Sequence, residues 1–172
     1  MTDMRQVGPL DRAKQPKTIL AGPYGHPFHP VLVTVPIGAW VASVVFDIIA
    51  LARADDAAPF AEGAYWLIGI GIVGAVRAAL FGLMDLLTIP RGTKAFRTGL
   101  THMALNLTVV ALFVIDFAIR AAQGYEKTSI VSFIVSLIAL ALLGVSGWLG
   151  GKLAYHYGVR VASEETQSEG FR

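Results

Sequence analysis

The sequence contains no cysteine and little charge, and both features narrow the choice of protein class. Without cysteine the chain has no disulfide, no thiolate metal site, no ligand for an iron–sulfur cluster and no attachment point for a c-type haem. Only 15% of its 172 residues are charged, against roughly 25% in a typical soluble domain. The net charge of +2 is too small to favour nucleic acid as a partner.

Apolar residues take the place of the missing charge. They make up 55% of the chain before its 18 glycines are counted. A soluble fold of this length could not bury so much apolar surface. The composition therefore excludes a soluble enzyme, a disordered tail and a secreted disulfide scaffold, and it indicates one domain embedded in a lipid bilayer.

Four long apolar stretches follow a polar segment at residues 1–25, which lacks the apolar core of a cleaved signal peptide. They cover residues 31–52, 64–88, 99–122 and 128–151. Each has about 20 or more residues, enough to cross a hydrocarbon core about 30 Å thick. Short links predict antiparallel neighbours. We therefore expect an all-α, four-helix up-down transmembrane bundle within residues 26–161 and a polar tail at 162–172.

The distribution of lysine and arginine predicts the orientation of this bundle in the cell (inner) membrane. Ten lie at one side of the predicted bundle: Arg5, Arg12, Lys14, Lys17, Arg91, Lys94, Arg97, Lys152, Arg160 and Arg172. Three lie at the other: Arg53, Arg120 and Lys127. Because cytoplasmic loops carry the excess of basic residues, both termini are expected in the cytoplasm.

Charged residues inside the spans are costly, at about 2.5–3.5 kcal/mol each on insertion scales, so they mark important positions. Asp47 and Asp116 fall at roughly the same depth near the outer face, about 25 Å from the cytoplasmic ends of their spans. Arg77 lies below them, at roughly 16 Å, and its long side chain could reach either acid. We favour a charge-compensating ion-pair layer that sets helix register; the alternative is a proton or ion relay.

A second polar layer is predicted at the cytoplasmic end, where all four histidines occur. His26 and His29 lie in the run G-H-P-F-H-P, whose prolines favour an extended backbone at the preceding histidines. Asp85 and His102 fall at the same depth, roughly 5 Å into their spans. Three imidazoles and one carboxylate suit zinc, iron or copper. Two of the histidines could instead bind a b-type haem axially.

Other readings of this layer remain open. Asn106 lies one helical turn after His102. With the more distant His156, it could orient the metal ligands by hydrogen bonds without binding the metal itself. The polar groups could also form only structural hydrogen bonds without any metal. Pro36 is expected to kink the first span beside the histidines.

The sequence resembles a known family in three segments. These are G-H-P-F-H-P-V-L-V-T-V-P-I-G (25–38), G-L-M-D-L-L-T-I-P (82–90) with His102 and Asn106 after it, and S-G-W-L-G-G-K-L-A-Y-H-Y-G-V-R-V (146–161). They are similar to the bacterial membrane family called domain of unknown function 2231. The resemblance implies a four-helix membrane domain. Some members adjoin a Rieske-type iron–sulfur domain, which implies redox chemistry with a partner. Arg77 and Tyr157 depart from the usual pattern.

Three functions follow as hypotheses. The first is a redox-associated membrane subunit that binds a haem or metal through the cytoplasmic histidine/aspartate layer. The second is a structural or assembly subunit, part of a homo-oligomer or larger membrane complex, which would use small-residue faces on the second and fourth spans. The third is a small oligomeric transporter, although no continuous polar stripe lines any span. No catalytic set that works without a cofactor is found, because Ser43 and Asp47 lie far from the histidines.

Overall fold

The structure, a computed structural model, describes residues 8–14, 18 and 27–172. Four long helices dominate it: α3 (Thr34–Ala52), α4 (Ala58–Leu86), α5 (Lys94–Gln123) and α6 (Ile130–Gly151). Shorter elements surround them: α1 (Pro9–Lys14), α2 (His29–Leu32), η3 (Ala54–Asp56), the π-helical turn η4 (Lys152–His156) and α7 (Glu164–Glu169). No strand occurs among the described residues. The all-α class and the four long apolar helices are confirmed.

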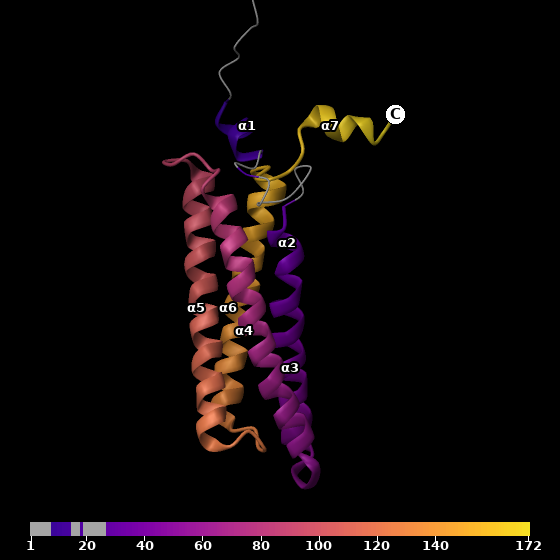
Figure 1. Ribbon diagram of the computed structural model, residues 1–172, viewed down its shortest axis with the longest axis vertical. Helices are drawn as coiled ribbons and strands as arrows, with labels where there is room; N and C mark the ends of the chain where they lie inside the picture. The colour runs from indigo at the N-terminus through magenta and orange to yellow at the C-terminus, as the bar shows by residue number, and fades with distance from the viewer. Residues whose placement is uncertain (1–7, 15–17, 19–26) are drawn as a thin grey trace, which may run out of the picture.

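The four long helices lie side by side, and their links alternate between two ends of the molecule (Figure 1). We call the end that carries α1 and α7 the terminal end, and the opposite end, with the links α3–α4 and α5–α6, the far end. The helix α3 packs most extensively against α4, and α5 against α6, while fewer contacts join these two hairpins. The fold is therefore two helical hairpins packed into one bundle.

Local signals explain where the helices start and stop. The hydroxyls of Thr93 and Ser129 accept hydrogen bonds from the backbone N–H groups of Phe96 and Ser132 and so cap α5 and α6. Gly124, at φ 81°, ends α5 in a conformation that glycine adopts readily. The helices α4 and α5 begin earlier than the apolar stretches suggested, at Ala58 and Lys94, because their first turns are helical without being strongly apolar.

The first membrane-spanning segment is interrupted near its start. The short helix α2 ends at Leu32 and α3 begins at Thr34. Pro36 has no N–H with which to satisfy the carbonyl of Leu32, so the regular helical ladder is broken there, as expected from the sequence. One expectation was wrong: His29 is not extended but is the first residue of α2, because Pro30 fits the first turn of a helix.

The apolar core lies midway along the bundle and is built around Trp40. Its indole stacks on the ring of Phe113, with ring centroids 4.2 Å apart. It also donates a hydrogen bond to the carbonyl of Ile68, at 3.3 Å. A Cβ at Gly71 would lie 2.2 Å from the Trp40 Nε1, so only glycine allows α3 and α4 to approach this closely.

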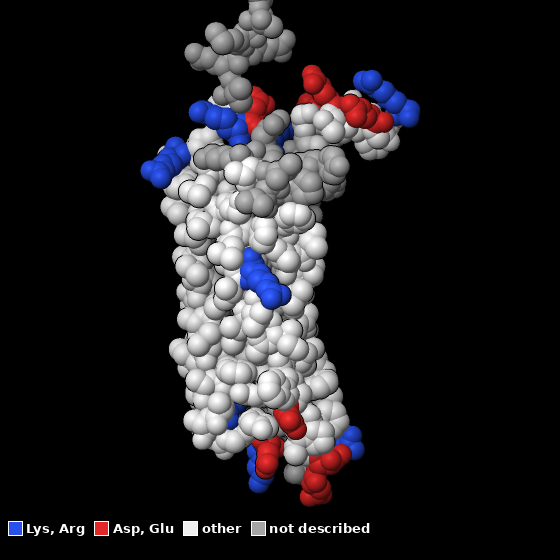
Figure 2. Space-filling view, in the orientation of Figure 1, with Lys and Arg blue, Asp and Glu red and all other residues white. Residues whose placement is uncertain are grey.

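The outer surface of the bundle is suited to lipid. Figure 2 shows charged side chains gathered at the two ends, with a long and nearly uncharged surface between them. Large apolar side chains are exposed along all four long helices, among them Val41, Val73, Ile115 and Ile138. The four segments His29–Ala52, Ala58–Leu86, Lys94–Gln123 and Ile130–His156 are long and apolar enough to cross a membrane. The apolar surface is therefore the face that a bilayer would cover.

Candidate functional site

Two histidines from different helices meet at the terminal end of the bundle. His29 begins α2, and His102 lies in the first third of α5. Their ring centroids are 6.2 Å apart and the ring planes are nearly perpendicular, at 89°. The sequence predicted both residues at the cytoplasmic end of the bundle, and the structure brings their side chains into contact. We call them the histidine pair.

Each imidazole of the histidine pair is held by a backbone carbonyl. The Nδ1 of His29 lies 2.9 Å from the carbonyl oxygen of Ala78, and the Nδ1 of His102 lies 2.8 Å from that of Ser146. Because a carbonyl oxygen only accepts, both Nδ1 atoms must carry the proton. The lone pair of each neutral ring is then on Nε2. Carbonyl contacts of this kind fix the orientation of metal-binding histidines in many proteins.

The Nε2 atoms of the pair have different surroundings. The Nε2 of His102 lies 3.0 Å from the side-chain amide nitrogen of Asn106, which donates to it. Asn106 therefore contacts the imidazole directly, from the same face of α5. No hydrogen bond of the His29 Nε2 is found within the described part of the chain.

Two glycines make room for the rings. A Cβ at Gly82 would lie 2.9 Å from the His29 ring, and a Cβ at Gly150 would lie 3.1 Å from the His102 ring. Both distances are tighter than ordinary side-chain contacts, so the bare helix backbone at these positions is what admits the imidazoles. Sequence reasoning treated Gly150 as a helix-packing residue and did not assign Gly82. Gly82 lies one helical turn after Ala78, whose carbonyl oxygen accepts the hydrogen bond from His29. This spacing is the signal that could have identified Gly82.

Asp85 forms an ion pair near this end of the bundle. Its Oδ1 lies 2.8 Å from the Nε of Arg160, and both side chains are largely buried. The backbone N–H of Arg160 donates to the carbonyl of Ala13 in α1, at 3.0 Å. The pair therefore ties the end of α4 to the segment after α6 and to α1. Sequence reasoning missed Arg160 as the partner of Asp85 because it lies beyond the last apolar stretch.

The remaining predicted ligands are not part of this arrangement. His156 is exposed and its ring packs on Tyr157, with centroids 4.9 Å apart. His26 lies outside the described residues. Within the described ranges, no group of three or more histidine, aspartate or glutamate side chains is arranged to hold a metal ion. The described residues thus offer a histidine pair rather than a complete four-ligand shell.

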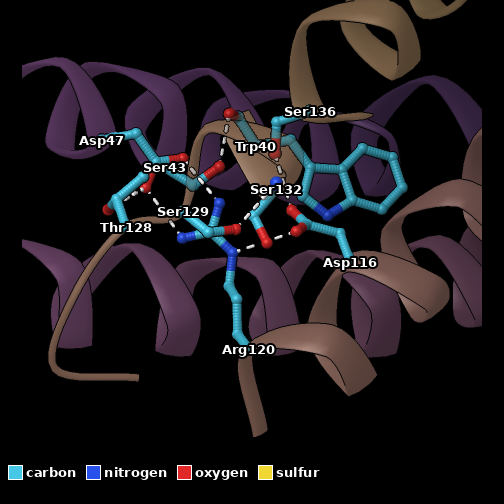
Figure 3. Close-up of polar contacts among 9 residues, drawn as sticks. All are labelled: Trp40, Ser43, Asp47, Asp116, Arg120, Thr128, Ser129, Ser132 and Ser136. Carbon is cyan, nitrogen blue, oxygen red and sulfur yellow. Dashed lines mark hydrogen bonds and ion pairs between the residues drawn. The ribbon is translucent and has the colours of Figure 1, made fainter. Parts of the chain in front are cut away.

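A second polar cluster lies in the far half of the bundle and centres on Arg120 of α5. Its Nη1 and Nη2 donate to the two carboxylate oxygens of Asp47 in α3, at 2.8 and 2.7 Å. Its Nε donates to Asp116, one turn earlier in α5, at 3.2 Å. Figure 3 shows the guanidinium between the two carboxylates. The arginine side chain is 3% exposed and both carboxylates are fully buried.

Hydroxyl groups from the start of α6 complete this ionic layer. Ser136 donates to the second oxygen of Asp116 at 2.7 Å, and Thr128, just before the helix, donates to Asp47 at 2.8 Å. The Oγ of Ser132 is buried nearby but has no hydrogen-bond partner within the described residues (Figure 3). The ionic layer consists of Asp47, Asp116, Arg120, Thr128 and Ser136, and it joins α3, α5 and the start of α6.

The arginine of the ionic layer is a correction to the sequence prediction. The structure brings Asp47 and Asp116 together as expected, but Arg120 and not Arg77 binds them. Arg77 is exposed on the outer surface of α4. Depth alone suggested Arg77, but the face of the helix decides which side chain points inward. The spacing of four residues between Asp116 and Arg120 is the signal that could have identified the partner.

The small-residue faces have mixed roles. On α4, a Cβ at Gly74 would lie 2.9 Å from Val35, and one at Gly69 would lie 3.1 Å from Phe117, so both glycines allow a neighbouring helix to approach α4 closely. On α6, Gly144 and Gly147 have nothing within 4 Å of an added Cβ. Gly144 and Gly147 are both exposed, so they form a strip on the outer surface of α6 that carries no side chain.

Four apolar helices of spanning length, with the charges of Asp47, Asp116 and Arg120 buried and paired between them, define a four-span helical membrane protein. The chain belongs to the family described as predicted membrane protein (DUF2231), which matches residues 25–163. This confirms the family that the His-Pro-x-His-Pro segment and the tail indicated. Neither the comparison with curated proteins nor that with solved structures gives a match.

Proposed function

We propose that this chain is a multi-pass protein of the cell (inner) membrane, an up-down bundle with both termini in the cytoplasm. The excess of lysine and arginine at the terminal end supports this orientation. The burial of Arg120 against Asp47 and Asp116 strengthens it, because Arg53 and Lys127 are then the exposed basic residues at the far end. Arg53 is in turn paired with Asp56.

The absence of cysteine allows a direct test of the orientation. Single cysteines at Lys127, between α5 and α6, and at Gln167, in α7, report on opposite ends of the bundle. A membrane-impermeant maleimide applied to intact cells should label Lys127→Cys and spare Gln167→Cys until the cells are lysed. The reverse pattern would overturn the orientation.

For the activity, we propose that the chain is a redox-associated membrane subunit that binds a transition metal or a b-type haem through the Nε2 atoms of His29 and His102. The observation that carries this proposal is that both Nδ1 atoms donate to backbone carbonyls, which leaves the lone pair of each neutral ring on Nε2, the atom that would bind the metal. A metal bound to two imidazoles at about 2.1 Å would place the ring centroids roughly 5–6.5 Å apart. The observed 6.2 Å is compatible with that range.

The rest of the shell would come from groups beyond the pair. His26 is three residues from His29 in the chain and remains a proposed third ligand. Asp85 is proposed to act as a charged neighbour rather than as a ligand, because its carboxylate is engaged by Arg160. Asn106 would have to release the Nε2 of His102 when a metal binds there.

The test is an optical spectrum together with metal analysis of the full chain purified in mild detergent. A Soret band that shifts on reduction indicates haem, and stoichiometric zinc, iron or copper without such a band indicates a metal ion. Substitution of either member of the pair by alanine should abolish binding. His156→Ala is the matched control, because this histidine is exposed and apart from the pair. A colourless, metal-free protein of normal stability would overturn the proposal.

A structural or assembly subunit is the second candidate function, and the ionic layer favours it. Asp47, Asp116 and Arg120 bond to one another and to hydroxyl groups of the same chain, so this polar layer is held together without a ligand. The exposed strip at Gly144 and Gly147 would allow another helix to approach closely. This candidate predicts that the protein, solubilised at its native expression level, migrates as a homo-oligomer or within a larger complex. A mass equal to one chain would contradict it.

A further inference from the structure

A groove with a volume of about 640 Å³ runs along the outer surface beside the middle of α4. That volume lies within the range of about 300–1,000 Å³ that is typical of small-molecule sites. The groove lies where α4 passes α2, α3 and α5, and apolar side chains and glycines make up nearly all of its lining. Its lining along α4 includes Trp66, Gly69, Ile70, Val73 and Gly74, and it ends toward the terminal end at Arg77.

Arg77 is the single charged residue of this lining. It is exposed and makes no hydrogen bond, ion pair or cation–π contact within the described residues. It lies roughly 14 Å along α4 from the terminal-end residue Leu86. If a hydrocarbon core about 30 Å thick is centred on this helix, the Arg77 Cα lies several Å inside it, within reach of the nearer surface by its long side chain. An unpaired guanidinium at this depth raises the free energy of the protein, so an anion that pairs with Arg77 would stabilise it.

The part of the chain that the structure describes does not offer that anion. The carboxylates of Asp47 and Asp116 bind Arg120, and that of Asp85 binds Arg160. Glu62, the nearest other acid of α4, lies roughly 22 Å away along the helix, toward the far end. The described residues of a second copy would therefore present no matching carboxylate at the depth of Arg77. The anion must come from a different molecule that is also apolar enough to lie in the groove.

We propose that this groove binds an anionic phospholipid of the leaflet at the terminal end, with its phosphate paired to the Arg77 guanidinium and one acyl chain lying toward Trp66. The direction of the groove supports this occupant, because Arg77 lies at its end nearer to the terminal-end membrane surface, and its apolar part continues along α4 through the bilayer centre to Trp66. The distance from Arg77 to Trp66 along α4 is roughly 16 Å, which is about the thickness of one leaflet of hydrocarbon. Arginine is also well suited to phosphate, which it can bind with two parallel hydrogen bonds.

Trp66 provides a local reporter for the acyl chain. It is 55% exposed and lines the groove, whereas Trp40 is 2% exposed in the core. In a Trp148→Phe background, the quenching of fluorescence by brominated acyl chains therefore reports mainly on Trp66. The probes are phosphatidylglycerol and phosphatidylcholine, each brominated in turn and mixed at equal fractions with the unbrominated form of the other.

We expect brominated phosphatidylglycerol to quench Trp66 with an apparent association about fivefold stronger than that of brominated phosphatidylcholine, the size of one arginine contact with an anionic lipid. Arg77→Gln should remove this preference, and Arg77→Lys should retain most of it. Arg97→Gln is the matched control, because Arg97 is also exposed but lies outside the groove, and it should leave the preference unchanged.

Three outcomes would overturn the proposal. The first is equal quenching by both lipids in the parent protein. The second is a preference that survives in Arg77→Gln. The third is a preference for a brominated free fatty acid with none for phosphatidylglycerol, which would make a soluble carboxylate the occupant. None of these results depends on the histidine pair, so they test the lipid proposal independently of the metal or haem proposal.

Discussion

Arg120 of α5 and Asp47 of α3 form a two-pronged salt bridge, with nitrogen–oxygen distances of 2.8 and 2.7 Å, and both side chains are shielded from solvent. The two residues belong to different hairpins, so this contact is a strong polar link between them. Its value for stability lies less in the attraction than in the penalty for breaking it, because one buried charge would remain unpaired.

Arg120→Met is therefore expected to destabilise the bundle by about 3–5 kcal/mol, since it leaves two carboxylates buried without a cation. The measurement is equilibrium unfolding in mixed micelles with increasing denaturing detergent. Arg77→Met is the control, because Arg77 is exposed and makes no polar contact within the described residues. Equal losses in the two variants would contradict the assigned role of Arg120.

Substitutions of Ser132 and Ser136 test how much the hydroxyl groups near the ionic layer contribute to stability. Both are fully buried on α6, but within the described residues only the Ser136 hydroxyl is hydrogen bonded, to Asp116 at 2.7 Å. Ser136→Ala should cost about 1–2 kcal/mol, because the carboxylate loses a donor. Ser132→Ala should be neutral or slightly stabilising, since it removes an unsatisfied hydroxyl. The same unfolding assay compares them, and a reversed order would refute the hydrogen-bond assignment.

Gly71 tests the close approach of α3 and α4. Gly71→Ala should destabilise the bundle by about 1–3 kcal/mol, because the new methyl group would overlap the Trp40 ring and disturb its stacking on Phe113. Near-ultraviolet circular dichroism should show the displaced indole. Gly144→Ala, at an open position of α6, should be neutral or stabilising. A neutral Gly71→Ala variant would mean that the helices separate at little cost.

Asn106 tests how the histidine pair binds its proposed ligand. Its amide occupies the Nε2 of His102, so Asn106→Ala should free this nitrogen and tighten metal binding about fivefold, the value of one hydrogen bond of about 1 kcal/mol. Titration calorimetry with the metal identified in the purified protein measures this change. A 10–100-fold loss of affinity would instead mean that Asn106 orients the imidazole as a supporting partner.

The sequence predicts the membrane architecture well because hydropathy and length are properties of each helix alone. The four spans, the interruption near Pro36 and the position of His29 and His102 at one end of the bundle follow from such local patterns. The choice of Arg120 over Arg77 depends on which helix face points inward, which depth does not specify. The pairing of Asp85 with Arg160 depends on a turn after α6, where Arg160 has φ 59°, and that turn carries no apolar signal.

The details of the histidine pair also lie beyond sequence patterns. Which ring nitrogen carries the proton is decided by the carbonyls of Ala78 and Ser146, on two other helices. These carbonyls reach the rings only because the fold places four segments around one point. A residue-by-residue count gives the depth of an imidazole, but its hydrogen bonds require the helices to be assembled.

The separation of Asp47 from Arg120 along the chain has a consequence for biosynthesis. The two residues are 73 positions apart, and the helices that carry them enter the membrane in order. Asp47 therefore enters the bilayer long before its counterion has been translated, so the first hairpin is left with an unneutralised acid. The salt bridge between the two hairpins can therefore form only after the third long helix, α5, has entered the membrane.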